Sequence, residues 1–234
     1  IGVTSNIQAK LQVVGTVNVT GPYIGSGDVD VGKGTDYRFL WRSAHGSLGV
    51  GKPLSDNWET TSYSYLFGDQ HNVQSDYAAV VGGQSLAIGA SSDHSSILGG
   101  KDNTIGTAEF ATILGGEGNS TKGKYSAVLA GNTNIIDNAE GAGILGGFHN
   151  GIADGADYSV AMGRRSKIKT GHTGVFLFSD SIDVDRESSA SNQFLIFAEN
   201  GVGIGTNNVS ATPNSLRVEG NVNVGGYIYG DGSK

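Results

Sequence analysis

One stretch of the sequence gathers acidic side chains at a spacing that could hold a metal ion. It reads SDSIDVDRE and contains Asp180, Asp183 and Asp185. Calcium prefers oxygen ligands, and clustered carboxylates are its usual protein donors. The ligand order of an EF-hand loop and its glycine are missing. The alternative is a solvated turn whose carboxylates pair with Arg164 and Arg165, and the sequence leaves both interpretations open.

Other patterns that accompany catalysis or cofactor binding are incomplete. The glycine-rich segments at 49–51 and 201–206 are not followed by a helical pattern, which a phosphate-binding loop requires. Serine, histidine and aspartate are present, but the G-x-S-x-G elbow of many hydrolases is not. The absence of cysteine excludes disulfides and thiolate chemistry. We therefore expect no catalytic residue, no cofactor and no resident metal.

The elements that must position these side chains are repeats of one short motif. Between residues 63 and 181 it recurs seven or eight times, with an anchor residue every 14 to 17 positions. A short fixed period indicates a repeat architecture, and this one is too short to include a crossover helix. We predict an all-β fold, a parallel β-roll or β-solenoid of about seven to eight coils. The anchors are Gly68, Gly82, Gly99, Gly115, Ala130, Gly146 and Gly163.

Two further columns recur in step with the anchors. An aromatic residue stands five positions before most anchors, and we interpret this column as a packing stack. An asparagine stands four positions after most anchors, where it can bond to its own turn and to the next asparagine. The asparagine column comprises Asn72, Asn103, Asn119, Asn134 and Asn150.

The strand at the centre of each repeat is apolar on both faces. Successive strand residues point to opposite faces, yet both residues before each anchor are apolar or nearly so. One face can fill the inside of the coil, whereas the other needs a second apolar surface. The simplest source is another copy of the chain, so we expect a homo-oligomer. The residues expected in the core or at this interface are Leu98, Leu114, Leu129, Leu145 and Met162.

The repeat, written [YF]-S-x-[IV]-[LM]-G-G-x-x-N, resembles the head repeat of trimeric autotransporter adhesins, the YadA-like head. The segments 159–181 and 192–206 resemble parts of related bacterial and phage fibre proteins. The resemblance covers about 140 of the 234 residues. It implies a homotrimer of left-handed parallel β-rolls. Because the period varies more here than in the most regular heads, we expect some coils to bulge.

A longer motif flanks the repeats on both sides. Residues 1–28 and 204–234 share L-x-V-x-G-x-VNV followed by G-x-YI. This alternation is typical of strands, and we interpret the two copies as short β junction modules between segments of a fibre. A β brace is expected at 29–62, before the repeats at 63–181. An exit strand and second brace are expected at 182–203.

Composition narrows the class of partners. The net charge of −7 argues against nucleic acid, whose binding depends on lysine and arginine, and no apolar run is long enough to cross a bilayer. We expect a non-enzymatic, extracellular fibre segment of a bacterial surface adhesin or phage tail fibre. It would bind its own copies, further fibre modules and a host-surface glycan or protein. The alternatives are a glycan-degrading tailspike-type enzyme, or a fibre part processed by a downstream self-cleaving chaperone.

Overall fold

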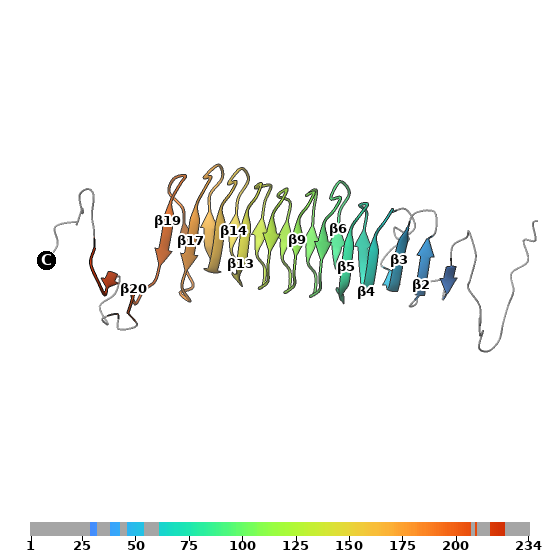
Figure 1. Ribbon diagram of the computed structural model, residues 1–234, viewed down its shortest axis with the longest axis horizontal. Helices are drawn as coiled ribbons and strands as arrows, with labels where there is room; N and C mark the ends of the chain where they lie inside the picture. The colour runs from blue at the N-terminus through green and yellow to red at the C-terminus, as the bar shows by residue number, and fades with distance from the viewer. Residues whose placement is uncertain are drawn as a thin grey trace, which may run out of the picture.

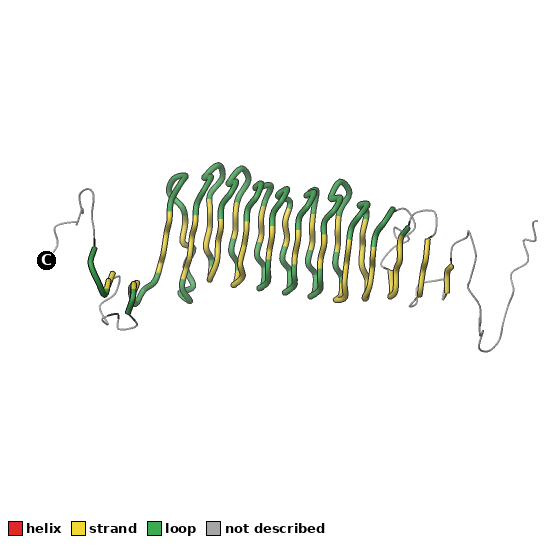
Figure 2. The backbone as a smooth tube through the Cα atoms, viewed as in Figure 1, coloured by secondary structure: helices red, strands yellow, loops and turns green. Residues whose placement is uncertain are grey.

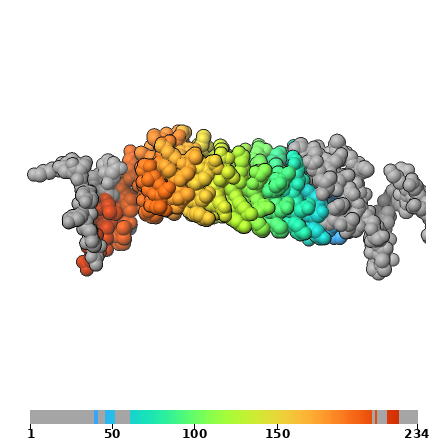
Figure 3. Space-filling view, turned by 90° about the horizontal axis from the view of Figure 1, so that it is seen from above, coloured from blue at the N-terminus to red at the C-terminus, as the bar shows by residue number. Residues whose placement is uncertain are grey.

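The computed structural model describes residues 29–31, 38–42, 46–53, 61–206, 209 and 216–222 of the chain. The described residues are all-β and contain no helix. Short strands lie side by side along the long axis of the molecule (Figure 1), and the space-filling view shows the described residues as an elongated body (Figure 3). The architecture is a parallel β-solenoid of about ten turns. The prediction of an all-β solenoid is therefore confirmed.

Most turns contribute one strand to each of two sheets, and loops join the strands at both edges (Figure 2). Sheet A contains β3 (Ser47–Pro53), β4 (Tyr65–Val73), β5 (Ala79–Gln84), β7 (Ser96–Ile97), β9 (Thr112–Ile113), β11 (Ala127–Val128), β13 (Gly143–Phe148), β15 (Val160–Arg164), β17 (Phe176–Ser179) and β19 (Phe194–Phe197). Sheet B contains the end of β4, β6 (Ala87–Ile88), β8 (Thr104–Ile105), β10 (Ser120–Thr121), β12 (Ile135–Ile136), β14 (Gly151–Ile152), β16 (Ser166–Ile168) and β18 (Arg186–Glu187).

The core lies between the inner faces of the two sheets. From β4 to β17, each strand turns a small, aliphatic or β-branched residue inward, and these residues stack from turn to turn. Ile97 and Ile113 from sheet A and Ile105 from sheet B are each fully buried. Branched side chains suit this position because they pack closely on a pleated surface.

The stack is longer than the repeats alone. We expected seven to eight coils with a separate brace on each side, but β3 pairs in parallel with β4, and β19 pairs in parallel with β17. The segments interpreted as braces thus extend sheet A by further turns. At the N-terminal end the strand direction then reverses, because β2 (Arg38–Arg42) pairs antiparallel with β3 and with β1 (Val29–Val31).

Little of the junction modules falls within the described residues. Residues 1–28 lie outside them altogether. In the C-terminal copy, β20 (Val202–Ile204) and β21 (Leu216–Val218) form a separate two-stranded parallel sheet.

The corner that follows each sheet A strand contains two structural positions, one tight and one open. The spacing of the anchors in the sequence does not distinguish them. In turns with a Gly-Gly pair, the second glycine stacks tightly: a Cβ on Gly116 would lie 2.1 Å from the carbonyl oxygen of Gly131. The first is open, with nothing within 4 Å of a Cβ on Gly115, which explains why Ala130 fits there. The tight column comprises Gly51, Gly68, Gly83, Gly100, Gly116, Gly131, Gly147 and Gly163.

Two of the anchors therefore differ from the other five. Gly68 and Gly163 belong to the tight column, whereas Gly82, Gly99, Gly115, Ala130 and Gly146 occupy the open position. The ladder shifts register between Phe67 and Asp69 and between Ile144 and Gly146, where a one-glycine turn meets a two-glycine turn. These are the bulges expected from the varying period, since the extra residue is left out of the ladder.

The asparagine column is built as expected over four turns. Asn119 donates from its backbone and side-chain nitrogens to Oδ1 of Asn103, and its side chain also donates to the carbonyls of Gly115 and Gly131. Asn134 and Asn150 repeat this pattern. Such bonds satisfy corner backbone groups that would otherwise be buried without partners.

Asn72 is not part of this ladder, because the one-glycine turn at Gly68 shifts the column by one residue. His71 takes the place instead and is fully buried. Its Nε2 lies 2.9 Å from the carbonyl oxygen of Phe67, and its Nδ1 accepts a hydrogen bond from the backbone nitrogen of Leu86. Burial lowers the pKa of His71, so the ring is neutral and bridges two turns as an asparagine would.

Candidate functional site: the outer face of sheet A

The outer face of sheet A presents a continuous column of large apolar side chains. Leu98, Leu114 and Leu145 are 47, 42 and 45% exposed, although their inward neighbours in the same strands are fully buried. Leu129 is also exposed and Met162 is partly buried. We call this set the outer apolar column: Val50, Phe67, Val81, Leu98, Leu114, Leu129, Leu145, Met162, Phe178 and Ile196.

A second outward column runs beside it, two residues earlier in each strand. It is uncharged as well and small in the middle turns: Tyr65, Ala79, Ser96, Thr112, Ala127, Gly143, Val160, Phe176 and Phe194. About ten turns at roughly 4.8 Å per strand make this face roughly 45 Å long. Single soluble chains rarely expose contiguous apolar patches of more than a few hundred square ångströms, so this face is a candidate interface.

An aromatic ladder lies along one side of the face, two residues before the small column. Tyr63, Tyr77, His94, Phe110 and Tyr125 stack with ring centroids 4.8 to 5.2 Å apart. Each of these residues has a positive φ near 57°. The expected packing stack is therefore present. Because each ring covers the face of the next, the ladder offers mainly ring edges to solvent.

The ladder is interrupted at Gly141, where no ring is available. The ring of Tyr158 packs there instead, with Cδ1 3.0 Å from the position of a Cβ on Gly141. Tyr158 remains 68% exposed.

The acidic run pairs with the two arginines. Arg164 and Arg165 both contact Asp183, at 2.9 and 3.4 Å, and Nε of Arg165 donates to Asp185 at 2.8 Å. The hydrogen bond from Arg165 is the main cause of a lowered pKa for Asp185. The structure therefore supports the paired turn over the calcium loop.

Asp180 has a different role from the rest of the run. It accepts hydrogen bonds from the backbone nitrogens of Glu199 and Ile182, and these bonds lower its pKa. The carboxylate thus connects the exit of the roll to the turn after β19. Among the described residues, no three histidine, cysteine or acidic side chains group as metal ligands would.

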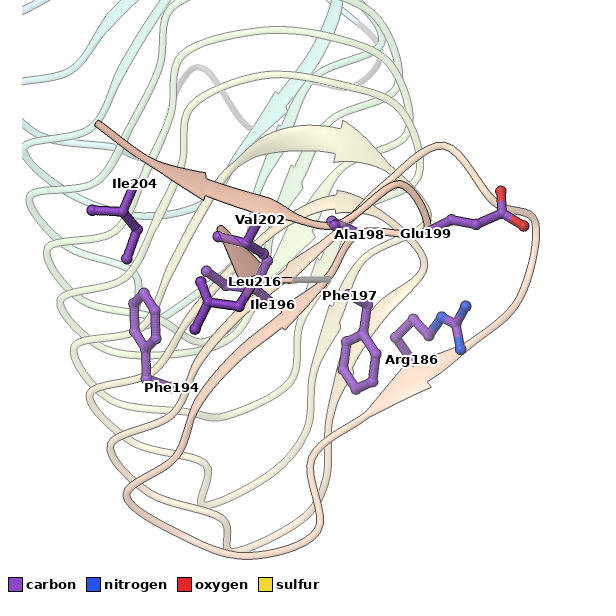
Figure 4. A pocket seen from close by; sticks show the side chains of 10 residues that line it. Arg186, Phe194, Ile196, Phe197, Ala198, Glu199, Val202, Ile204 and Leu216 are labelled. Atoms are coloured by element: carbon purple, nitrogen blue, oxygen red, sulfur yellow. The ribbon is translucent and has the colours of Figure 1, made fainter. Parts of the chain in front are cut away.

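A cavity lies at the C-terminal end of the apolar face. It has a volume of about 410 Å³ and is bounded by β19, β20 and β21. In Figure 4, Phe194, Ile196, Val202, Ile204 and Leu216 line one part of it, and Arg186 and Glu199 lie at the other side. The guanidinium carbon of Arg186 is 5.2 Å from the ring centroid of Phe197. Because Phe194 and Ile196 end the two outward columns, this cavity continues the apolar face.

A second pocket, on the outer face of sheet B, is lined in part by acidic side chains, which raises the question of glycan cleavage. A glycoside hydrolase needs a carboxylic acid with a raised pKa. Here each acidic residue is paired with a cation, and the pKa of Asp185 is lowered. The pairs are Asp137–Lys122 (3.0 Å), Asp185–Arg165 (2.8 Å) and Glu187–Lys169 (2.6 Å).

Sequence reasoning missed two side chains that the structure makes prominent. His71 was overlooked because Asn72 matched the expected spacing. Lys167 lies over Gly151 in the sheet B pocket. The one feature of the sequence that could have indicated this contact is that Gly151 stands one turn before Lys167 on the same face.

The described residues include no helix long and apolar enough to cross a membrane. No protein-family model matches the chain, and no curated protein or solved structure matches it at a significant level. The outer face of sheet A therefore has to be interpreted from its own geometry.

Proposed function

We propose that this chain is a non-enzymatic structural and adhesive segment of a homotrimeric extracellular fibre, either a bacterial surface adhesin or a phage tail fibre. The observation that carries the proposal is the outer apolar column on sheet A, whose side chains are exposed or half-buried in the single chain and uncharged along its whole length. In water this surface is costly to leave open.

The repetition of the face favours identical chains as its partners. Its side chains recur once per turn, at the spacing of parallel strands. A partner that matches this spacing over ten turns must itself be a β-solenoid, and a copy of the same chain in register meets the requirement. The resemblance of the repeat to YadA-like heads suggests how many chains assemble: three left-handed β-rolls around one axis.

The fibre would act by projection and avidity. Three chains present the same exposed side chains at the same height, and repeated weak contacts along one rod multiply their effect. End-to-end junctions with further modules would lengthen the rod. The partners would be a host-surface glycan or protein.

Mass measurement tests the trimer directly. We expect light scattering on the purified chain to give three times the chain mass of 24.0 kDa, and this value should persist through a wide dilution series. The variant Leu129→Glu would place a carboxylate against its symmetry copies and should give the single-chain mass. A well-folded monomer of the unaltered chain, stable to dilution, would refute the trimer.

Glycan cleavage is tested separately, by incubating the protein with capsular polysaccharides and measuring their chain length. We expect no shortening, because the described acidic residues of the sheet B pocket are ion-paired. The alternative of processing by a downstream chaperone concerns Ser233 and Lys234, which lie outside the described residues.

A further inference from the structure

The outer face of sheet B contains an open pocket of about 730 Å³ centred on β14. Ile135 in β12 and Asp137 just after it lie on one side, and Lys167 in β16 and Lys169 just after it lie on the other. Between them, Gly151 has no side chain and Ala153 has only a methyl group, which leaves the space open. This pocket lies on the face opposite the proposed trimer interface.

Lys167 occupies the space that Gly151 leaves. Its Cδ and Nζ lie 3.4 and 3.8 Å from the position of a Cβ on Gly151. The ammonium group donates a hydrogen bond to the carbonyl oxygen of His149. An ammonium has three N–H donors, so two remain available for a ligand in the pocket.

Lys167 differs from the other lysines whose side chains the structure describes. Lys101, Lys122, Lys124 and Lys169 each contact a carboxylate on a neighbouring turn. Within the described part of the chain, no carboxylate lies within ion-pair distance of Lys167. Burial lowers the pKa of Lys167, and the more distant carboxylate of Asp185 offsets this only in part.

The acidic side chains of the pocket already have partners. Asp137, Asp185 and Glu187 are paired with Lys122, Arg165 and Lys169. Among the described charged side chains that line the pocket, Lys167 is the one without an ion pair. An anion bound here would restore the pairing that the other four lysines already have.

We propose that this pocket binds acidic saccharides, with the carboxylate of a uronic acid accepting hydrogen bonds from the ammonium group of Lys167. The rest of the rim suits a sugar ring. Asp137 and Thr170 can hydrogen-bond to hydroxyls, and Ile135 and Ala153 provide a short apolar surface for the ring carbons. An open pocket on a rod surface also admits an internal residue of a longer glycan.

The test is a binding titration of the whole protein with a galacturonate trisaccharide, with the neutral galactose trisaccharide as reference. Binding would be followed by NMR signals of the Lys167 side chain and by calorimetry. We expect the acidic saccharide to shift these signals and raise the pKa of Lys167, and the neutral one to bind at least tenfold more weakly. A charge-assisted hydrogen bond accounts for a roughly tenfold or larger difference.

Two variants and one control complete the test. Lys167→Gln should weaken binding of the acidic saccharide roughly tenfold or more. Gly151→Leu should abolish binding, because it fills the pocket and displaces Lys167, and its backbone does not require a glycine. Lys101→Gln removes the same charge elsewhere on the rod and should leave the affinity unchanged.

The proposal is overturned if Lys167→Gln binds the acidic saccharide as tightly as the unaltered chain. Equal binding of the neutral saccharide would overturn it as well, and so would binding of a glutamate-rich peptide in place of either sugar. These outcomes do not depend on the oligomeric state, so they are separate from the test of the trimer.

Discussion

The two sheets of the solenoid are alike inside and different outside. Their inner faces are columns of buried aliphatic residues, and the same hydrogen-bonded ladder joins both sets of strands. The outer face of sheet A has an uncharged apolar column, whereas that of sheet B carries Lys122, Asp137, Lys167 and Glu187. The inner faces therefore meet the needs of folding, and the difference between the outer faces is what the proposed trimer would explain.

The largest expected effect separates the two outer faces. Leu114→Lys on sheet A should abolish the proposed trimer, because an ammonium buried among copies of itself would have no counter-charge. Thr104→Lys, on the outer face of sheet B, is the matched control and should leave the mass unchanged. Light scattering and far-UV circular dichroism on both variants measure assembly and fold. Equal behaviour of the two variants would remove the distinction between the faces.

The next effect concerns the corner that leads from sheet A to sheet B. Gly116→Ala should be strongly destabilising, since Gly116 has φ of 91° and its Cβ would lie 2.1 Å from the oxygen of Gly131. Gly115→Ala should be tolerated, because that position is open and Ala130 already occupies its equivalent. Thermal unfolding of the two variants provides the comparison. Similar melting temperatures would show that the corner can relax.

Truncating a buried side chain on the inner face of either sheet should lower the stability by a similar amount. Ile113→Ala in sheet A and Ile105→Ala in sheet B each leave a cavity in the same core, and each should cost about 2 to 5 kcal/mol of unfolding free energy. Chemical denaturation of matched samples gives both values. A difference well above 1 kcal/mol would mean that one sheet contributes more to folding than the other.

The smallest expected effect is a pH dependence at His71. Its pKa is lowered in the folded chain from the ordinary 6.5, so the unfolded chain takes up a proton first as the pH falls. The stabilisation by the neutral ring is complete above pH 6.5 and is lost as the pH falls below it. The free energy of unfolding then decreases by at most about 1.4 kcal/mol per pH unit, since one proton is taken up.

The protonated ring could no longer accept the hydrogen bond from Leu86. The charge of Asp69 acts on the ring and opposes the lowering of the pKa. His71→Asn would restore the residue type of the later turns. We expect unfolding of this variant, followed between pH 7 and pH 5, to lose the His71 component of the pH dependence. An unchanged profile would place the titrating group elsewhere.

The match between sequence and structure depends on which direction is considered. Across a strand, alternation indicated that two neighbouring apolar residues face opposite ways, and the structure places Ile97, Ile113 and Ile144 on the inner face. Along the stack, counting residues from one anchor to the next failed at Gly68 and Gly163. A bulge adds a residue to the chain without adding a rung to the ladder, so equal spacing in sequence is not equal position in space.

In the candidate site, too, the sequence indicated some features and could not indicate others. The sequence indicated that one apolar face of each strand needs a second apolar surface, because a coil has room inside for only one of the two. It placed Leu98, Leu114 and Leu145 in the core or at that interface, and the structure shows that they face outward. It also indicated that Arg164 and Arg165 could pair with the acidic run. It could not indicate that Lys167 lacks such a pair, because partners on neighbouring turns are 15 to 20 residues apart and the offset varies from turn to turn.

The sequence by itself determined the repeat, the all-β class and the two-sided apolar strand, since these follow from composition and from a period too short for any helix. Only the tertiary structure decided where the stack ends, which corner glycines leave no room for a Cβ, and that His71 takes the place of an asparagine. Those features depend on hydrogen-bond register between turns, which arises only when the strands pair.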